Sequence, residues 1–221
     1  HRLRLDDGRG PAQAGLARLT EPSLADVVRG RRMTRSFDAS RPVPAGLLED
    51  LVDLASRAPS AGKVQGWHLV VLEGAETARF WDVTLPAERR AGFAWPGLLD
   101  APVIALPLAD PSAYLRRYAE ADKSATGVGA AAEAWPVPYW TVDAAFAVMT
   151  LLLAAEARGL GALFFGVFRG EEELRAALRI PGDLALLGAI ALGWPGPATG
   201  AGRSAARPRR PPAEIIHRGR W

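Results

Sequence analysis

The chain of 221 residues contains no cysteine and three histidines. The absence of cysteine excludes disulfides, thiolate zinc sites and a cysteine nucleophile. The histidines, at positions 1, 68 and 217, are far apart, and none has a neighbouring ligand at a metal spacing such as H-x-x-x-H. We therefore predict no metal site and interpret His68 as a strand residue rather than a catalytic base. Redox chemistry in this chain would need a bound cofactor.

Lysine is scarce as well, since it occurs at positions 63 and 123 alone and the remaining basic residues are arginine. The formal net charge is +3. A nucleic-acid-binding module is one alternative for a basic chain, and its binding would weaken steeply with salt. The aromatic residues are not interleaved with the arginine clusters, however, and the whole chain is rich in Ala, Gly, Pro and Arg. We interpret the arginine content as compositional bias of the source genome and expect no nucleic-acid partner.

Long apolar runs are missing too. The run 144–155 is too short for a membrane span of roughly 20 residues and lies between Asp143 and Glu156, so it predicts a buried core helix and no membrane partner. Residues 1–20 are polar and Gly-rich and have no hydrophobic signal core, so we expect a disordered or flexible arm and, by default, a cytoplasmic protein. The rest predicts a single domain over residues 21–221.

The remaining sequence alternates between helical and strand patterns without an internal repeat. Ser23 is placed to cap a short helix through about Gly30, and Pro44 is placed as the first residue of a second helix, which Pro59 stops. Apolar runs predict strands covered on both faces at 68–72, 103–108, 162–167 and 184–192. Further helices are expected at about 75–82, 112–121, 142–158 and 171–178.

One loop carries most of the functional signal. Residues 57–68 (RAPSAGKVQGWH) run from the end of an amphipathic helix into a buried strand. Backbone amides and a few polar side chains are thereby placed where a flat ligand can dock, which indicates a cofactor site. Taken alone, the loop fits an ordinary helix-to-strand connection equally well.

Basic clusters near both ends of the chain form a second signal. Arg31, Arg32 and Arg35 follow the first predicted helix, and their guanidinium groups suit a phosphate. A solvated arginine cluster is the alternative. The run RPRRPP at 207–212 supplies a matching basic cluster and makes a shared anion site the better interpretation. The irregular tail, residues 193–221, does not belong in a self-contained core, so we expect it to wrap a second subunit.

Four motifs, in this order, resemble those of the nitroreductase family of FMN flavoproteins. They are RRMTRSF at 31–37, APSAGKVQGW at 58–67, GLGALFFG at 159–166 and RPPAE at 210–214. The resemblance extends from about Ser23 to the C-terminus. Two further runs, WPVPYWTVD at 135–143 and HRGRW at 217–221, look like an actinobacterial branch of that family.

The resemblance implies an α+β fold with three α/β/α layers around a central mixed, mainly antiparallel sheet. It also implies a homodimer in which the C-terminal extensions, residues 193–221, exchange and add a strand to the partner's sheet. FMN would lie in the interface, in contact with both subunits. The implied mechanism is ping-pong: NAD(P)H delivers a hydride to flavin N5 and leaves, and a nitroaromatic, quinone or similar small acceptor then takes the hydride at the same face.

The resemblance assigns the arginines to the flavin. Arg31 and Arg32 would hold the FMN phosphate, and Arg209 or Arg210 of the tail would assist them. Arg35 falls beside the pyrimidine edge. Reduction leaves negative charge on the N1 and C2 carbonyl region there, so a fixed cation raises the affinity for the electron pair.

Other positions would contact the isoalloxazine or the substrate. Gly166, next to Phe165, would offer its backbone N–H to flavin N5, because any side chain would hold the backbone away from the ring. No side chain is a certain catalytic group, since the chemistry occurs at the flavin. The remaining cofactor-binding candidates are Met33 and, toward the partner's flavin, Pro59, Ser60, Ala61, Lys63 and Gln65. Candidates for stacking a planar substrate are Tyr139, Trp140 and Phe164, for which packing is the commoner role.

Several departures from the family pattern leave the substrate open. Met33 stands where Ser is common, Lys63 where Asn is common, Gly66 where Pro is common, and Phe165 where some members carry Glu. Lys63 adds a charge that can meet either the flavin or the substrate. A flavin-storing protein without turnover and a flavin or deazaflavin dehydrogenase of a biosynthetic intermediate are the alternatives. No dinucleotide fingerprint decides between NADH and NADPH.

Overall fold

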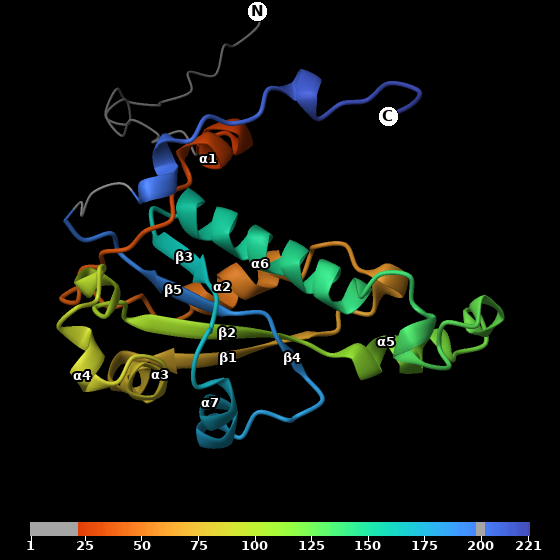
Figure 1. Ribbon diagram of the computed structural model, residues 1–221, viewed down its shortest axis with the longest axis horizontal. Helices are drawn as coiled ribbons and strands as arrows, with labels where there is room; N and C mark the ends of the chain where they lie inside the picture. Colours follow the sequence, from red (N-terminus) through yellow and green to blue (C-terminus); the bar gives the residue numbers. More distant parts are fainter. Residues whose placement is uncertain (1–21, 198–201) are drawn as a thin grey trace, which may run out of the picture.

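A five-stranded sheet forms the centre of the computed structural model, which describes residues 22–197 and 202–221 (Figure 1). The predicted arm, residues 1–20, lies outside the described residues. The strands follow the order β1-β2-β5-β3, and β4 pairs with β2 next to β5. All strand pairs are antiparallel, and the parallel bridge between Met33 and Ala162 makes the sheet mixed and mainly antiparallel, as predicted. The strands are β1 (Trp67–Glu73), β2 (Val103–Ala109), β3 (Gly161–Phe165), β4 (Ala185–Leu186) and β5 (Ala189–Gly193).

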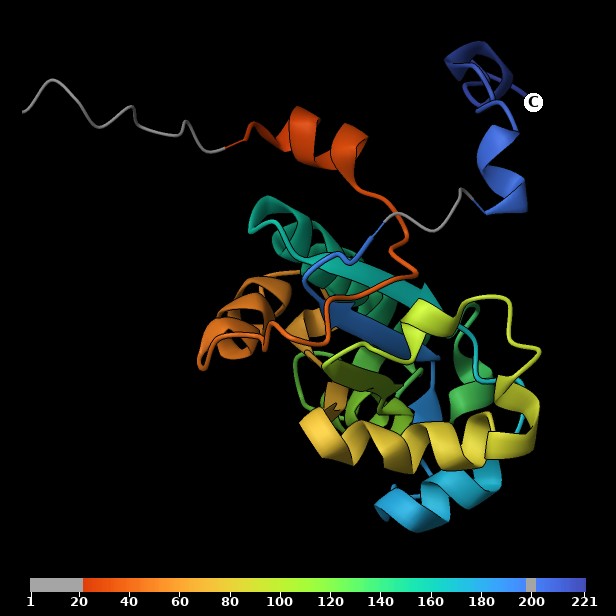
Figure 2. The same ribbon diagram turned by 90° about the vertical axis from the view of Figure 1, so that its left-hand side faces the viewer.

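Helices cover both faces of the sheet, so the fold has three layers (Figure 2). Along β2, Val103 packs into a core cluster with α2 and α6, whereas Ile104 packs into a second cluster with α3 and α7. All seven residues of β2 are buried, as expected for a strand covered on both faces. The helices are α1 (Leu24–Gly30), α2 (Leu47–Ala55), α3 (Ala78–Thr84), α4 (Ala87–Arg90), α5 (Pro111–Tyr118), α6 (Tyr139–Ala157) and α7 (Glu171–Leu178). Short 3-10 turns are η1 (Ala61–Lys63), η2 (Gly74–Thr77), η3 (Pro96–Leu98), η4 (Ser124–Thr126), η5 (Ala132–Ala134), η6 (Arg203–Ala206) and η7 (Pro212–Glu214).

Two element predictions are wrong in detail. The strand expected over 184–192 is two strands, β4 and β5, because the backbone turns at Gly188 with a φ of 147°. A Cβ at Gly188 would lie 2.5 Å from the carbonyl oxygen of Phe165, so the chain needs glycine there. The helix expected to begin at Pro44 begins at Leu47 instead, since Gly46 precedes it in the left-handed region.

The long helix α6 has one buried and one uncovered apolar side. It is 19 residues long and, within the part of the chain that the structure describes, is the helix whose length and composition would allow a membrane span. Its buried residues pack against α2 and the sheet, however, which confirms the predicted core helix. On the other side Phe146 and Met149 are 47% and 41% exposed. This uncovered side is available to a second subunit.

The C-terminal tail leaves the sheet after Trp194. Its first residues are still fixed, because Phe37 forms a bridge with Pro195 and the Gly196 N–H donates to the Ser36 carbonyl. Residues 205–221 are all exposed and stand away from the sheet (Figures 1 and 2). Strand exchange with a partner stays a prediction.

Candidate functional site

The arginine-rich segment that follows α1 runs along β3, the edge strand of the sheet. The Thr34 N–H donates to the Ala162 carbonyl at 3.0 Å, and Met33 forms its bridge to the same residue. Met33 packs against the core cluster of α3 and α7. We call residues 31–37 together with Phe165 and Gly166, at the end of β3, the edge half-site.

Arg31 has a buried guanidinium nitrogen in this half-site. Within the part of the chain that the structure describes, its Nη1 atom has no hydrogen-bond acceptor. A buried cationic donor without an acceptor is destabilising, and an anion is a partner that would satisfy it. The site therefore fits a ligand that carries a phosphate.

The other two arginines of the segment are already engaged. Arg32 Nη1 donates to the carbonyls of Arg29 and Gly30 at 2.6 and 2.8 Å, which caps the C-terminus of α1. The guanidinium of Arg35 lies over the Trp95 ring, 5.0 Å from its centroid, and donates to the Met33 carbonyl at 3.1 Å. The three arginines of this one motif thus have three different surroundings.

Phe165 ends β3 and Gly166 follows it, and both residues are partly buried. The Phe165 ring stacks on Trp81 and meets the edge of Phe80, so it is partly a core residue. A Cβ on Gly166 would come within 2.6 Å of the Phe168 ring, which is 92% exposed and can move. The nearest neighbour of a side chain at Gly166 is therefore a mobile one.

The loop between α2 and β1 forms a second half-site, at the other end of the molecule beside α5 (Figure 1). Lys63 and Gln65 have φ values of 55° and 52°, which are uncommon for residues with a side chain. Hydrogen bonds hold this conformation: Gln65 N donates to Ser60 Oγ at 3.0 Å, and Gln65 Nε2 donates to the Ser56 carbonyl at 2.8 Å. We call residues 56–66 and their supporting side chains the loop half-site.

Asp143 of α6 supports the loop from below. Its Oδ2 accepts from the Ala61 N–H at 2.7 Å and from the Tyr114 hydroxyl at 2.8 Å. Burial, followed by the nearby Asp143 carboxylate, raises the pKa of Tyr114, so the phenol stays neutral and donates. Arg117 adds a bond from Nε to the Gly62 carbonyl at 3.2 Å. One signal of this support is visible in the sequence, an acidic residue near the start of an apolar helix.

We expect Asp143→Ala to destabilise the protein by about 2 to 4 kcal/mol, because the variant leaves the Ala61 amide and the Tyr114 hydroxyl unpaired. Tyr114→Phe removes one bond and should cost about 1 kcal/mol. Denaturant unfolding measures both changes. Equal losses for the two variants would contradict a role of Asp143 in holding the loop.

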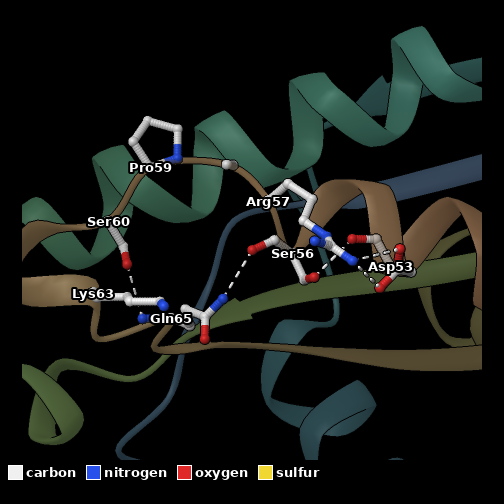
Figure 3. Close-up of a pocket in the computed structure, with 8 residues that line it drawn as sticks. Asp53, Ser56, Arg57, Pro59, Ser60, Lys63 and Gln65 are labelled. Atoms are coloured by element: carbon white, nitrogen blue, oxygen red, sulfur yellow. Dashed lines mark hydrogen bonds and ion pairs between the residues drawn. The ribbon is translucent and has the colours of Figure 1, made fainter.

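A surface hollow of about 540 Å³ opens at the loop half-site (Figure 3). Its volume is in the range of small-molecule pockets. The predicted cofactor residues Pro59, Ser60, Lys63 and Gln65 all contribute to its wall, whereas Ala61 does not. The other lining residues come from the end of α2 and the start of the loop: Asp53, Ser56, Arg57 and Ala58.

The three predicted substrate residues do not lie together. Phe164 is part of β3 and packs into the core cluster of α2 and α6. Tyr139 and Trp140 begin α6 and belong to an aromatic cluster around Trp135, whose ring centroid lies 5.9 and 6.1 Å from theirs. This aromatic cluster is next to the loop half-site, because Trp140 also meets Tyr114, the partner of Asp143.

The tail arginines are likewise separate from Arg31 in a single chain. Arg209 and Arg210 are exposed, and Arg210 pairs with Glu214 within the tail. The structure thus places Arg31 and Arg35 in the segment that pairs with the first residues of β3, and Gly166 directly after the end of β3. Ser60, Lys63 and Gln65 lie together at the loop half-site.

Comparisons with known proteins identify the family of this chain. The sequence pattern of the family described as the Nitroreductase family matches residues 28–194, which include both half-sites. An NADH dehydrogenase of Thermus thermophilus is 33% identical over 183 residues, covering 75% of this chain and 83% of that protein. A 4-nitrobenzoate reductase of Nocardioides sp. is 29% identical over 197 residues, covering 76% and 78%. A crystal structure from Exiguobacterium sibiricum, solved in complex with FMN, has a TM-score of 0.61 and 16% identity and covers 89% and 97% of the two chains. On this evidence the chain belongs to the nitroreductase family.

Proposed function

We propose that this protein is an FMN-dependent oxidoreductase that takes electrons from NAD(P)H and works as a homodimer. The observation that carries the proposal is the buried Nη1 of Arg31 at the edge half-site, for which the described residues offer no acceptor. A phosphate oxygen is the acceptor that a guanidinium binds best. The FMN of the Exiguobacterium sibiricum structure carries such a phosphate, and the Thermus thermophilus relative is named for its use of NADH.

Bound FMN would supply two-electron transfer between a nicotinamide and a small acceptor. The chain's own contribution is binding and orientation. Arg31 would hold the phosphate, and Arg35, fixed against Trp95, would present a cation to the electron-rich edge of the ring system. Gly166, without a side chain, would let the backbone approach the ring closely.

A second copy of the chain would complete the site, because the two half-sites lie apart within one chain (Figure 1). The uncovered side of α6, with Phe146 and Met149, is an apolar surface that a partner would bury. The exposed tail, with Ile215 and Trp221, would wrap that partner. In this arrangement the loop half-site of one subunit faces the edge half-site of the other, and Arg209 or Arg210 assists at the phosphate.

The acceptor that we propose is a nitroaromatic, a quinone or a similar small planar molecule. The name of the Nocardioides relative supports the first of these classes. Tyr139 and Trp140, beside the loop half-site, would offer aromatic surface to a planar ring. Because NAD(P)H is a cytoplasmic reductant, we place the protein in the cytoplasm.

Anaerobic mixing of the purified protein with NADH or NADPH tests this function. We expect a yellow protein that releases FMN on denaturation, loses its visible flavin absorption with one of the two donors, and regains it when 4-nitrobenzoate or a quinone is added. A flavoprotein that neither donor bleaches would store the flavin or oxidise its own substrate instead. A colourless protein that FMN does not reconstitute would contradict the proposal.

A further inference from the structure

The hollow of the loop half-site is lined by two positively charged side chains and one negatively charged side chain, so its net charge is +1. Its charged side chains are Asp53, Arg57 and Lys63. Arg57 Nη2 lies 3.3 Å from both carboxylate oxygens of Asp53, so these two residues neutralise each other. In Figure 3 this pair lies on the far side of the hollow from Lys63. The ion pairs found among residues 22–197 and 202–221 do not include Lys63.

The backbone holds Lys63 in a strained conformation at the wall of this hollow. Its φ of 55° lies in the left-handed region, where a long side chain is unfavourable. The Lys63 N–H donates to the Ser60 carbonyl at 2.9 Å, and Arg117 fixes the neighbouring Gly62 carbonyl at 3.2 Å. Figure 3 shows the Lys63 side chain beside Ser60 and Gln65, along the wall. Strain that hydrogen bonds maintain on both sides of a residue is typical of positions with a functional task.

We propose that Lys63 selects an acceptor that carries a carboxylate, such as an aromatic acid, by pairing with that carboxylate in the hollow. The proposal rests on the proposed function and names its substrate class. One unbalanced positive charge matches a monoanion, whereas the dianionic phosphate of NADPH would leave excess negative charge beside Asp53. A hollow of about 540 Å³ has room for an aromatic acid of this size.

The test compares 4-nitrobenzoate with uncharged nitrobenzene, using the FMN-loaded protein at a saturating donor concentration. The measured quantity is the kcat/KM for 4-nitrobenzoate divided by the kcat/KM for nitrobenzene. Lys63→Gln should lower this ratio about tenfold, because one charge-assisted hydrogen bond to the carboxylate is lost. Lys63→Arg should restore most of the ratio. A direct measurement of benzoate binding by calorimetry needs no turnover, and Lys63→Gln should weaken it about tenfold as well. The calorimetric measurement therefore tests whether Lys63 binds a carboxylate even if the protein has no reductase activity.

The matched control is the chain's other lysine. Lys123 lies outside the hollow, with Nζ 5.8 Å from the centroid of the Tyr118 ring, and Lys123→Gln should leave both the ratio and benzoate binding unchanged. The proposal would be overturned if Lys63→Gln left the ratio unchanged. It would also be overturned if benzoate failed to bind the wild-type protein. An effect of Lys63→Gln that is limited to a higher KM for NADPH would also overturn the proposal, because Lys63 would then bind the electron donor and not the acceptor.

Discussion

Replacing Arg31 with Met should stabilise the flavin-free protein and weaken FMN binding, two effects of opposite sign. The variant removes a buried cationic nitrogen that has no acceptor among residues 22–197 and 202–221 and keeps most of the apolar stem. We expect the melting temperature without flavin to rise by about 2 to 4 °C, which corresponds to about 1 kcal/mol. The Kd for FMN should increase about 10- to 100-fold, because a charge-assisted bond contributes about 1.5 to 3 kcal/mol.

Arg32 provides the control for this prediction. Its guanidinium caps the C-terminus of α1 through the carbonyls of Arg29 and Gly30, so Arg32→Met should lower the melting temperature of the flavin-free protein. Its effect on the Kd for FMN should be smaller than that of Arg31→Met. Thermal melts and fluorescence titrations of FMN measure both quantities. If Arg31→Met lowers the melting temperature without changing FMN affinity, then Arg31 has a structural role and the phosphate lies elsewhere.

The fold was predictable where burial is uniform along an element. The apolar run 103–108 predicts a strand covered on both faces, and β2 is buried at every position. The run 184–192 looks the same in sequence, yet it breaks at Gly188, because the backbone there must pass the Phe165 carbonyl of a strand that is distant in sequence. A contact of this kind leaves no periodic signal. The presence of strands in these two runs could therefore be predicted from the sequence, whereas the interruption at Gly188 could not.

The site was predictable as a set of residues but not as a set of roles. Arg31, Arg32 and Arg35 share one motif, and nothing in the motif separates a buried unpaired group from a helix cap. That difference arises from where each side chain meets the packed chain. Asp143 escaped prediction for the same reason, since its partners Ala61 and Tyr114 are distant in sequence. Tertiary packing decides these roles.

Replacing Gly166 with Val should abolish turnover with little loss of stability. In the flavin-free chain the three atoms nearest to the new Cβ all belong to the ring of Phe168, which is 92% exposed and free to move aside. The backbone at Gly166 is not in the left-handed region, so it does not by itself require glycine. In the proposed site, however, the side chain would hold the backbone away from the flavin. We expect kcat/KM to fall at least about a hundredfold, the size of effect that a displacement of about 1 Å can have, together with loss of bound FMN from the purified protein.

Two further variants separate the flavin site from a local clash. Gly182→Val places the same side chain where a Cβ meets nothing within 4 Å, so it should keep both FMN and turnover. The double variant Gly166→Val with Phe168→Ala removes the clash within the chain but not the clash with the flavin, so it should remain without FMN. If the double variant recovers yellow colour and turnover, the Phe168 ring caused the defect, and the flavin does not lie against Gly166. If it stays colourless while it melts at the temperature of the flavin-free wild type, the backbone at Gly166 is in direct contact with the cofactor.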